Sequence, residues 1–142
     1  MKKFKQLVLL FLVTSATLVS CNKDDDGDSA SIEGSWEFSK TGFIVGGVEQ
    51  LDDYENTSGC NKDFIEIKSG GMLSDHYFED LGSGCEELID NGTWTRDGDN
   101  FTLNYTDEVV SGKILELSNT TLKVKATDPD FNIEAIIVFT RK

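Results

Sequence analysis

The sequence is poor in basic residues. Its 142 residues include 13 Lys and Arg against 26 Asp and Glu, which gives a formal net charge of −13 at pH 7. Proteins bind nucleic acid by neutralising its phosphates with Lys and Arg, so an excess of negative charge opposes that contact. Nucleic acid is therefore excluded as a partner, and anionic lipid headgroups are disfavoured. The charge is typical of a well-solvated surface.

Histidine and cysteine are scarce as well, with one and three copies. No Cys-x-x-Cys pair is present, so we expect no metal site and no cofactor. His76 stands beside Asp75 and near Glu79, a setting in which it could act as a general base. No motif for a Ser or Cys nucleophile accompanies it. We therefore expect a protein that is not an enzyme, and catalysis through His76 is the alternative.

Helical periodicity is absent, and we find no internal repeat of solenoid or propeller length. Apolar residues instead alternate with polar ones, as in residues 32–39 and 122–126, where Lys123 and Lys125 are expected to face outward. The buried face of 72–78 stays open, because both parities contain apolar side chains. We expect strands at 32–39, 43–49, 63–67, 72–78, 93–95, 101–105, 114–117, 122–126 and 131–140, with long loops at 50–62 and 79–91 and a turn at Asp128-Pro129-Asp130.

Short strands joined by tight turns, with one proline in the chain, indicate an all-β fold that is either an antiparallel sandwich or a barrel. Sequential hairpins without a long return connection favour an up-and-down antiparallel barrel of about eight strands. Closure also removes the open sheet edges that invite aggregation. In the last strand Phe131, Ile133, Ala135, Ile137 and Phe139 are expected to share one side. Ile136 and Val138 on the other side indicate partial cover there.

The N-terminus has the three parts of a secretory signal peptide: a cationic start at 1–5, an apolar stretch at 7–13 and small residues at 19–20. An uncleaved membrane helix is the alternative, but it needs about 20 apolar residues. Leu18-Val19-Ser20-Cys21 resembles the lipobox of bacterial lipoproteins. The resemblance implies cleavage after residue 20 and a Cys21 that carries fatty acyl chains such as palmitate.

Residues 21–31 are then expected to form a lipidated Cys followed by a flexible acidic tether. Loss of Lys2, Lys3 and Lys5 leaves 10 basic and 26 acidic side chains, a net charge of −16. The stretch 23–25, Lys-Asp-Asp, is similar to the export signal of some Gram-negative lipoproteins. We expect a lipid anchor in the outer membrane, facing either the periplasm or the cell surface.

With Cys21 lipidated, Cys60 and Cys85 remain. In an exported protein two remaining cysteines are most simply a disulfide. A metal site or a redox-active pair is less consistent with a spacing of 25 positions. The bond is predicted to tie the loops around residues 60 and 85 together at one rim of the barrel.

Gly34-Ser35-Trp36 in the first strand and Arg141 at the end of the last resemble the lipocalin superfamily. Over 32–142 the order of Gly-x-Trp, Cys60, Cys85, Gly92-Thr93-Trp94 and a final Arg is similar to the lipocalin-like domain of short bacterial lipoproteins. The resemblance implies that Trp36 lies across the closed end of a barrel with Arg141 stacked on its indole. It also implies a small apolar ligand.

Candidate ligand-binding side chains face the interior in the expected strands: Trp94, Phe101, Leu103 and Tyr105. The alternative is a barrel filled by its own side chains. Such a protein would be a structural or interaction module that contacts a protein or glycan through loops 50–62 and 79–91. The oligomeric state is open.

Overall fold

The computed structural model describes residues 30–127 and 133–142. The expected signal peptide, Cys21, residues 22–29 of the tether, the turn at 128–130 and Phe131 lie outside these residues. Within the described ranges, no helix is long and apolar enough to cross a membrane. Helical structure there amounts to a 3-10 turn, η1 (Ser69–Gly71).

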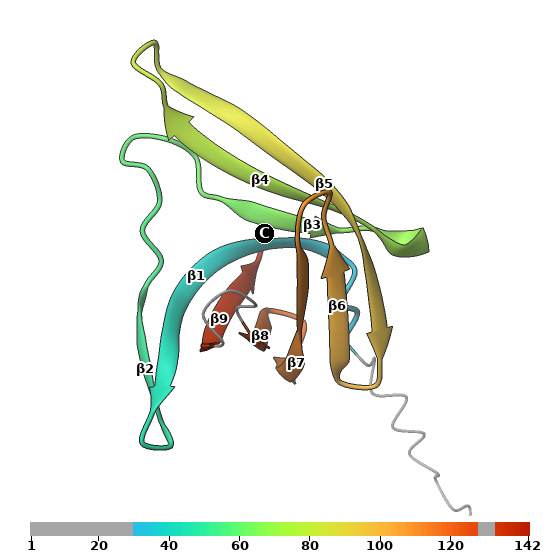
Figure 1. The fold of residues 1–142 in the computed structure, drawn as a ribbon. Helices are drawn as coiled ribbons and strands as arrows, with labels where there is room; N and C mark the ends of the chain where they lie inside the picture. The colour runs from blue at the N-terminus through green and yellow to red at the C-terminus, as the bar shows by residue number, and fades with distance from the viewer. Residues whose placement is uncertain (1–29, 128–132) are drawn as a thin grey trace, which may run out of the picture.

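Antiparallel strands make up most of the described chain (Figure 1). They are β1 (Gly34–Val45), β2 (Val48–Asp53), β3 (Phe64–Ile67), β4 (Met72–Asp80), β5 (Cys85–Asp97), β6 (Asn100–Asn104), β7 (Val109–Leu117), β8 (Thr121–Thr127) and β9 (Glu134–Arg141).

The long, curved strand β1 closes the sheet into a barrel. One edge of its first half pairs with β3, and its other edge pairs with β9. From β3 to β9 each strand pairs with the next in the sequence, so eight strands form the ring, and β2 pairs with the second half of β1. The prediction of an antiparallel up-and-down barrel of about eight strands is confirmed, and the sandwich is excluded.

The strand expected at 43–49 is wrong. Strand β1 continues without a break to Val45, and Gly46 and Gly47 form a tight turn with φ of 60° and 81°. Positive φ at both central residues is the geometry of a two-residue hairpin, which favours glycine. Residues 48–53, expected as part of a strand and a loop, therefore form β2.

The loop expected at 79–91 is also wrong. Strands β4 and β5 form a long hairpin whose connection is only 81–84, and 93–95 is the last part of β5. This hairpin projects beyond the barrel at the upper left of Figure 1. Residues 85–91 are exposed on both faces. Their sequence therefore has no alternation between apolar and polar positions, and polarity alone suggested a loop.

The connections divide the barrel into two ends. At one, which we name the closed end, lie the turns at 69–71, 98–99 and 118–120, together with Gly34 and Arg141. At the other, the open end, lie the turns at 46–47, 81–84 and 105–108.

The expected inward face of β8 is confirmed, because Leu122, Val124 and Ala126 are buried.

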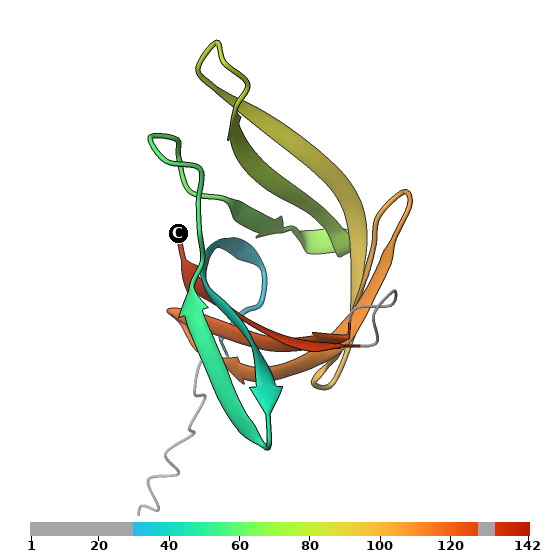
Figure 2. The same cartoon turned by 60° about the vertical axis from the view of Figure 1, so that its left-hand side comes forward.

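The outer face of β9 is covered more completely than the sequence suggests. Ile136 has no exposed surface although its neighbours Ile137 and Ala135 face the interior. The β1–β2 hairpin lies over this face, as Figure 2 shows, and Glu49 of β2 forms an ion pair with Lys123 of β8. The hairpin thus shields one side of the barrel wall from water.

Candidate ligand site

Trp36 and Arg141 lie together at the closed end. The Trp36 side chain is fully buried, and its Nε1 donates a hydrogen bond of 2.7 Å to the Ile32 carbonyl oxygen. The Arg141 guanidinium lies over the indole at 4.4 Å from the ring centroid, where a cation–π attraction operates. Arg141 also donates a hydrogen bond of 2.9 Å to the Glu33 carbonyl oxygen. The structure thus has the contact that the resemblance implied.

Gly34 makes room for this contact. Its φ is 133°, and a Cβ atom added there would lie 2.6 Å from Nη1 of Arg141. A side chain at position 34 would strain the backbone and push the guanidinium off the indole. The three residues expected to close the barrel therefore lie together.

Above these residues lies a small apolar cavity of about 70 Å³. All twelve of its lining side chains are apolar, among them three of the predicted ligand-binding residues, Trp94, Phe101 and Leu103. The indole Nε1 of Trp94 donates a hydrogen bond to the Lys68 carbonyl oxygen at 2.9 Å. The side chains of the barrel thus leave part of the interior unfilled, and the cavity at the closed side offers no polar group to a ligand.

A larger pocket of about 280 Å³ continues from this cavity toward the open end. The two spaces share Ile65, Leu103, Val110, Ile137 and Phe139. The rest of the larger pocket is lined by Phe38 and by polar side chains: Tyr54, Asp75, Tyr77, Asp90, Tyr105 and Glu108. Tyr105, the fourth predicted ligand-binding residue, belongs here.

The floor of the larger pocket carries a buried carboxylate. Asp75 is 6% exposed, and its Oδ2 accepts a hydrogen bond of 3.2 Å from the Tyr105 hydroxyl. Its Oδ1 is buried and accepts no hydrogen bond from the described residues. Burial raises the pKa of Asp75 from 3.8 to about 6; the hydroxyls of Tyr77 and Tyr105 oppose this rise, and the Asp90 carboxylate adds to it.

The tyrosines of this pocket remain hydrogen-bond donors. Burial, and next to it the Asp75 carboxylate, raise the pKa of Tyr77 and of Tyr105 well above the ordinary value of 10.0. Burial and the hydrogen bond to Asp63 do the same for the pKa of Tyr54. All three phenols are therefore neutral at any physiological pH.

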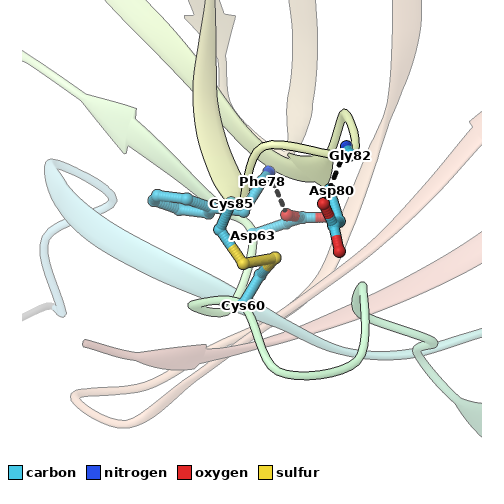
Figure 3. The surroundings of a disulfide bond; sticks show 6 residues. All are labelled: Cys60, Asp63, Phe78, Asp80, Gly82 and Cys85. Atoms are coloured by element: carbon cyan, nitrogen blue, oxygen red, sulfur yellow. Dashed lines mark hydrogen bonds between the residues drawn. A yellow bond between two sulfur atoms is a disulfide. The ribbon is translucent and has the colours of Figure 1, made fainter.

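The rim of the pocket is fixed by the residues around the disulfide. Cys60 and Cys85 are bonded, with 5.5 Å between their Cα atoms, so the predicted disulfide is confirmed (Figure 3). Beside it, buried Asp63 accepts hydrogen bonds of 2.8 Å from the Phe78 amide and 2.9 Å from the Tyr54 hydroxyl. The disulfide joins the β2–β3 connection to the first residue of β5, and the hydrogen bond to Asp63 holds the Tyr54 hydroxyl.

His76 lies outside the site. Its ring stacks on Phe64 with centroids 4.1 Å apart, and its Nδ1 is 2.8 Å from a Glu87 carboxylate oxygen on the outer face of the barrel. Asp75, the next residue, faces the interior, so the two side chains point in opposite directions. In the described part of the chain no three His, Cys, Asp or Glu side chains are grouped to hold a metal ion.

Apart from Tyr105, the acidic and phenolic half of the site was not predicted from the sequence. Two residues that the sequence left undecided belong to one face: Leu73 and Tyr77 point inward with Asp75 between them. A useful signal was their shared parity, because a polar residue flanked at i±2 by inward side chains must also face inward. Asp90 follows from pairing, because it lies opposite Asp75 in the β4–β5 register.

A closed eight-stranded barrel with Gly34 and Trp36 at one end and an interior pocket is the architecture of the lipocalins. Residues 32–124 match the family model described as a lipocalin-like domain, and the chain belongs to this family. The resemblance noted in the sequence is thereby confirmed.

Two solved structures from Bacteroides show the same fold at low identity. A lipocalin-like protein from Bacteroides uniformis ATCC 8492 is 11% identical, with a TM-score of 0.57 over 78% of this chain and 97% of that chain. An uncharacterized protein from Bacteroides eggerthii DSM 20697 is 9% identical, with a TM-score of 0.55 over 79% and 100%. Comparison with curated protein sequences finds no significant match.

Proposed function

We propose that this protein is an exported, membrane-anchored lipoprotein whose barrel binds a small, largely apolar molecule and catalyses no reaction. The observation that carries the proposal is the unfilled apolar cavity, continuous with a pocket at the open end. A barrel of eight strands is wide enough either to be filled by its own side chains or to hold one small ligand. Here the side chains leave space, and apolar cavities of this kind bind apolar molecules.

The two spaces together reach the lower end of the range of ligand pockets, about 300–1,000 Å³. Burying a ligand methylene contributes about 0.8 kcal/mol. A short alkyl or aromatic group in the smaller cavity therefore provides binding energy, and the wider pocket accommodates the remainder of the molecule.

A matched pair of neighbouring residues tests this proposal. Val110 lines both spaces, whereas Val109 is 54% exposed. Val110→Phe should fill the junction and weaken binding of an apolar fluorescent probe at least tenfold, while Val109→Phe should leave it unchanged. Native mass spectrometry of the purified protein identifies a retained ligand. Equal probe binding by both variants, or none by the parent protein, contradicts the proposal.

Lipid anchoring through Cys21 is the second part of the proposal, supported by the resemblance of residues 18–21 to a lipobox. More than one acyl chain is needed for a stable anchor, because a single chain binds membranes only marginally. Cys21→Ser should move the protein from the detergent phase to the aqueous phase in a partition experiment. Retention in the detergent phase rules out this anchor. Cell fractionation and surface protease treatment test the proposed outer-membrane location.

An interaction module is the alternative, and exposed apolar side chains around the open end favour it. At the β1–β2 turn Val45 is 56% and Val48 64% exposed, and on the β4–β5 hairpin Leu81 is 56% and Ile89 51% exposed. Exposed apolar side chains on projecting hairpins can mark a protein interface. Loss of partner capture in Val48→Ser and Ile89→Ser, with probe binding intact, supports this second function.

A further inference from the structure

We infer that the larger pocket binds the cationic head of the ligand, so that the ligand class is an organic amine with an apolar body. This inference rests on the proposed function, since it assigns a chemistry to the polar part of the same molecule. The apolar body would lie in the cavity at the closed side, and the ammonium group would lie among the side chains of the larger pocket.

The strongest observation is the condition of Asp75. It is more than nine-tenths buried and lines the pocket, and its Oδ1 has no hydrogen-bond partner among the described residues. A buried carboxylate oxygen left without a donor is costly, and native structures rarely retain one. An ammonium group carries up to three N–H donors and a compensating charge, and it would satisfy this oxygen.

The charge around Asp75 points the same way. Asp90 lies directly opposite on β5, and Glu108 lines the same pocket from the β6–β7 turn. Like charges at directly opposed positions destabilise a sheet. None of the described residues lining this pocket is Lys, Arg or His. The pocket therefore has a negative potential that the protein itself does not neutralise there.

The aromatic walls also fit a cation. The chain has three tyrosines, and all of them line this pocket: Tyr54, Tyr77 and Tyr105. The face of a tyrosine ring attracts a cation within about 6 Å, most strongly where water is excluded. Neutral phenols beside a carboxylate and around an ammonium group form a cage that an alcohol or a carboxylic acid would not use as well.

A metal ion is a poorer occupant. Calcium takes six to eight oxygen ligands and magnesium requires near-octahedral geometry. The described residues contain no group of three acidic, His or Cys side chains placed for such coordination. An organic cation needs one buried carboxylate and the aromatic walls, both of which are present.

Three ligands that share the same six-carbon alkyl chain and differ only in the head group distinguish these possibilities. We would titrate the purified protein at neutral pH with n-hexylamine, n-hexanol and hexanoate by calorimetry. The amine should bind about ten- to hundredfold more tightly than the alcohol, because a hydrogen bond to a charged group is worth that factor. Hexanoate should bind most weakly.

Asp75→Asn should remove the preference for the amine while hexanol binding remains. Asp97→Asn, which removes the same charge from an exposed position on β5, is the matched control and should keep the preference. Asp90→Asn changes an exposed side chain of the same pocket and should lower the preference even if the Asp75 variant does not fold.

The outcomes distinguish this inference from the proposed function. Hexanol binding that equals amine binding overturns the inference and leaves apolar ligand binding intact. An amine preference that survives both Asp75→Asn and Asp90→Asn overturns the assignment to this pocket. Failure of all three ligands to bind contradicts the proposed function and removes the basis of the inference.

Discussion

The closed and open ends of the barrel differ in whether one buried polar side chain has its hydrogen bonds satisfied. At the closed end the Trp36 indole donates its hydrogen bond, and Arg141 is held by its aromatic face and a backbone carbonyl. In the pocket toward the open end Asp75 is also buried, but its Oδ1 accepts no hydrogen bond from the described residues. A buried polar group with hydrogen-bond partners stabilises the fold, whereas a buried polar group without a partner is typical of a ligand-binding site. Substitutions of Trp36 and of Asp75 should therefore change stability in opposite directions.

Trp36→Ala should give the largest loss. Truncating a fully buried aromatic side chain typically costs about 3–5 kcal/mol. Urea unfolding followed by circular dichroism measures this loss, and Trp94→Ala is the control because Trp94 is only partly buried and lines an existing cavity. Equal losses in the two variants would mean that Trp36 contributes no more to stability than Trp94 does.

Removal of the disulfide should rank next, and it acts at the open end. Closing a loop across 25 positions restricts the unfolded chain and stabilises the protein by about 3 kcal/mol. Cys60→Ser combined with Cys85→Ser should lower the free energy of unfolding by about this amount. Dithiothreitol should destabilise the parent protein to a similar extent and leave the double variant unchanged. A parent protein insensitive to reduction would contradict the expectation.

Asp75→Asn should instead stabilise the protein without ligand at neutral pH. The pKa of Asp75 is about 6 when folded against 3.8 ordinarily, so its ionised form favours unfolding by about 2–3 kcal/mol above pH 6. This penalty disappears as the pH falls from 6 toward 4, where the folded protein holds the proton. The stability difference between parent and variant should therefore be largest above pH 6 and shrink at pH 4. Asp97→Asn should show no such pH dependence.

Arg141→Ala should have the smallest effect, a loss of about 1 kcal/mol for an exposed cation–π contact. Thermal unfolding measures it, and Gly34→Ala provides a coupled test because it displaces the same guanidinium. If the two residues act through one contact, the double variant should lose less than the two single variants added together. If the losses of the two single variants simply add in the double variant, Gly34 and Arg141 stabilise the protein independently of each other.

The sequence predicted the closed end better than the open end. Alternation is strong where one face packs in a core, and it correctly placed Leu122, Val124 and Ala126 inside. It failed at 85–91, where both faces of a projecting hairpin are solvated and period-two patterning has no cause. The burial of Asp75 could not be predicted from alternation either. A charged residue is expected at the surface until the closure of the barrel and the pairing of β4 with β5 are known.

The position of the first strand has a consequence for how such a protein stands on a membrane. Strand β1 begins at Gly34, at the closed end, so the proposed anchor at Cys21 joins the barrel on the side away from the pocket. The nine residues from Asn22 to Ala30 can extend to at most about 30 Å. With the anchor attached at the closed end, the open end of the barrel can face the surrounding water and point away from the bilayer. A ligand would then be exchanged with the aqueous phase or a neighbouring protein, and release would not require the barrel to leave its anchor.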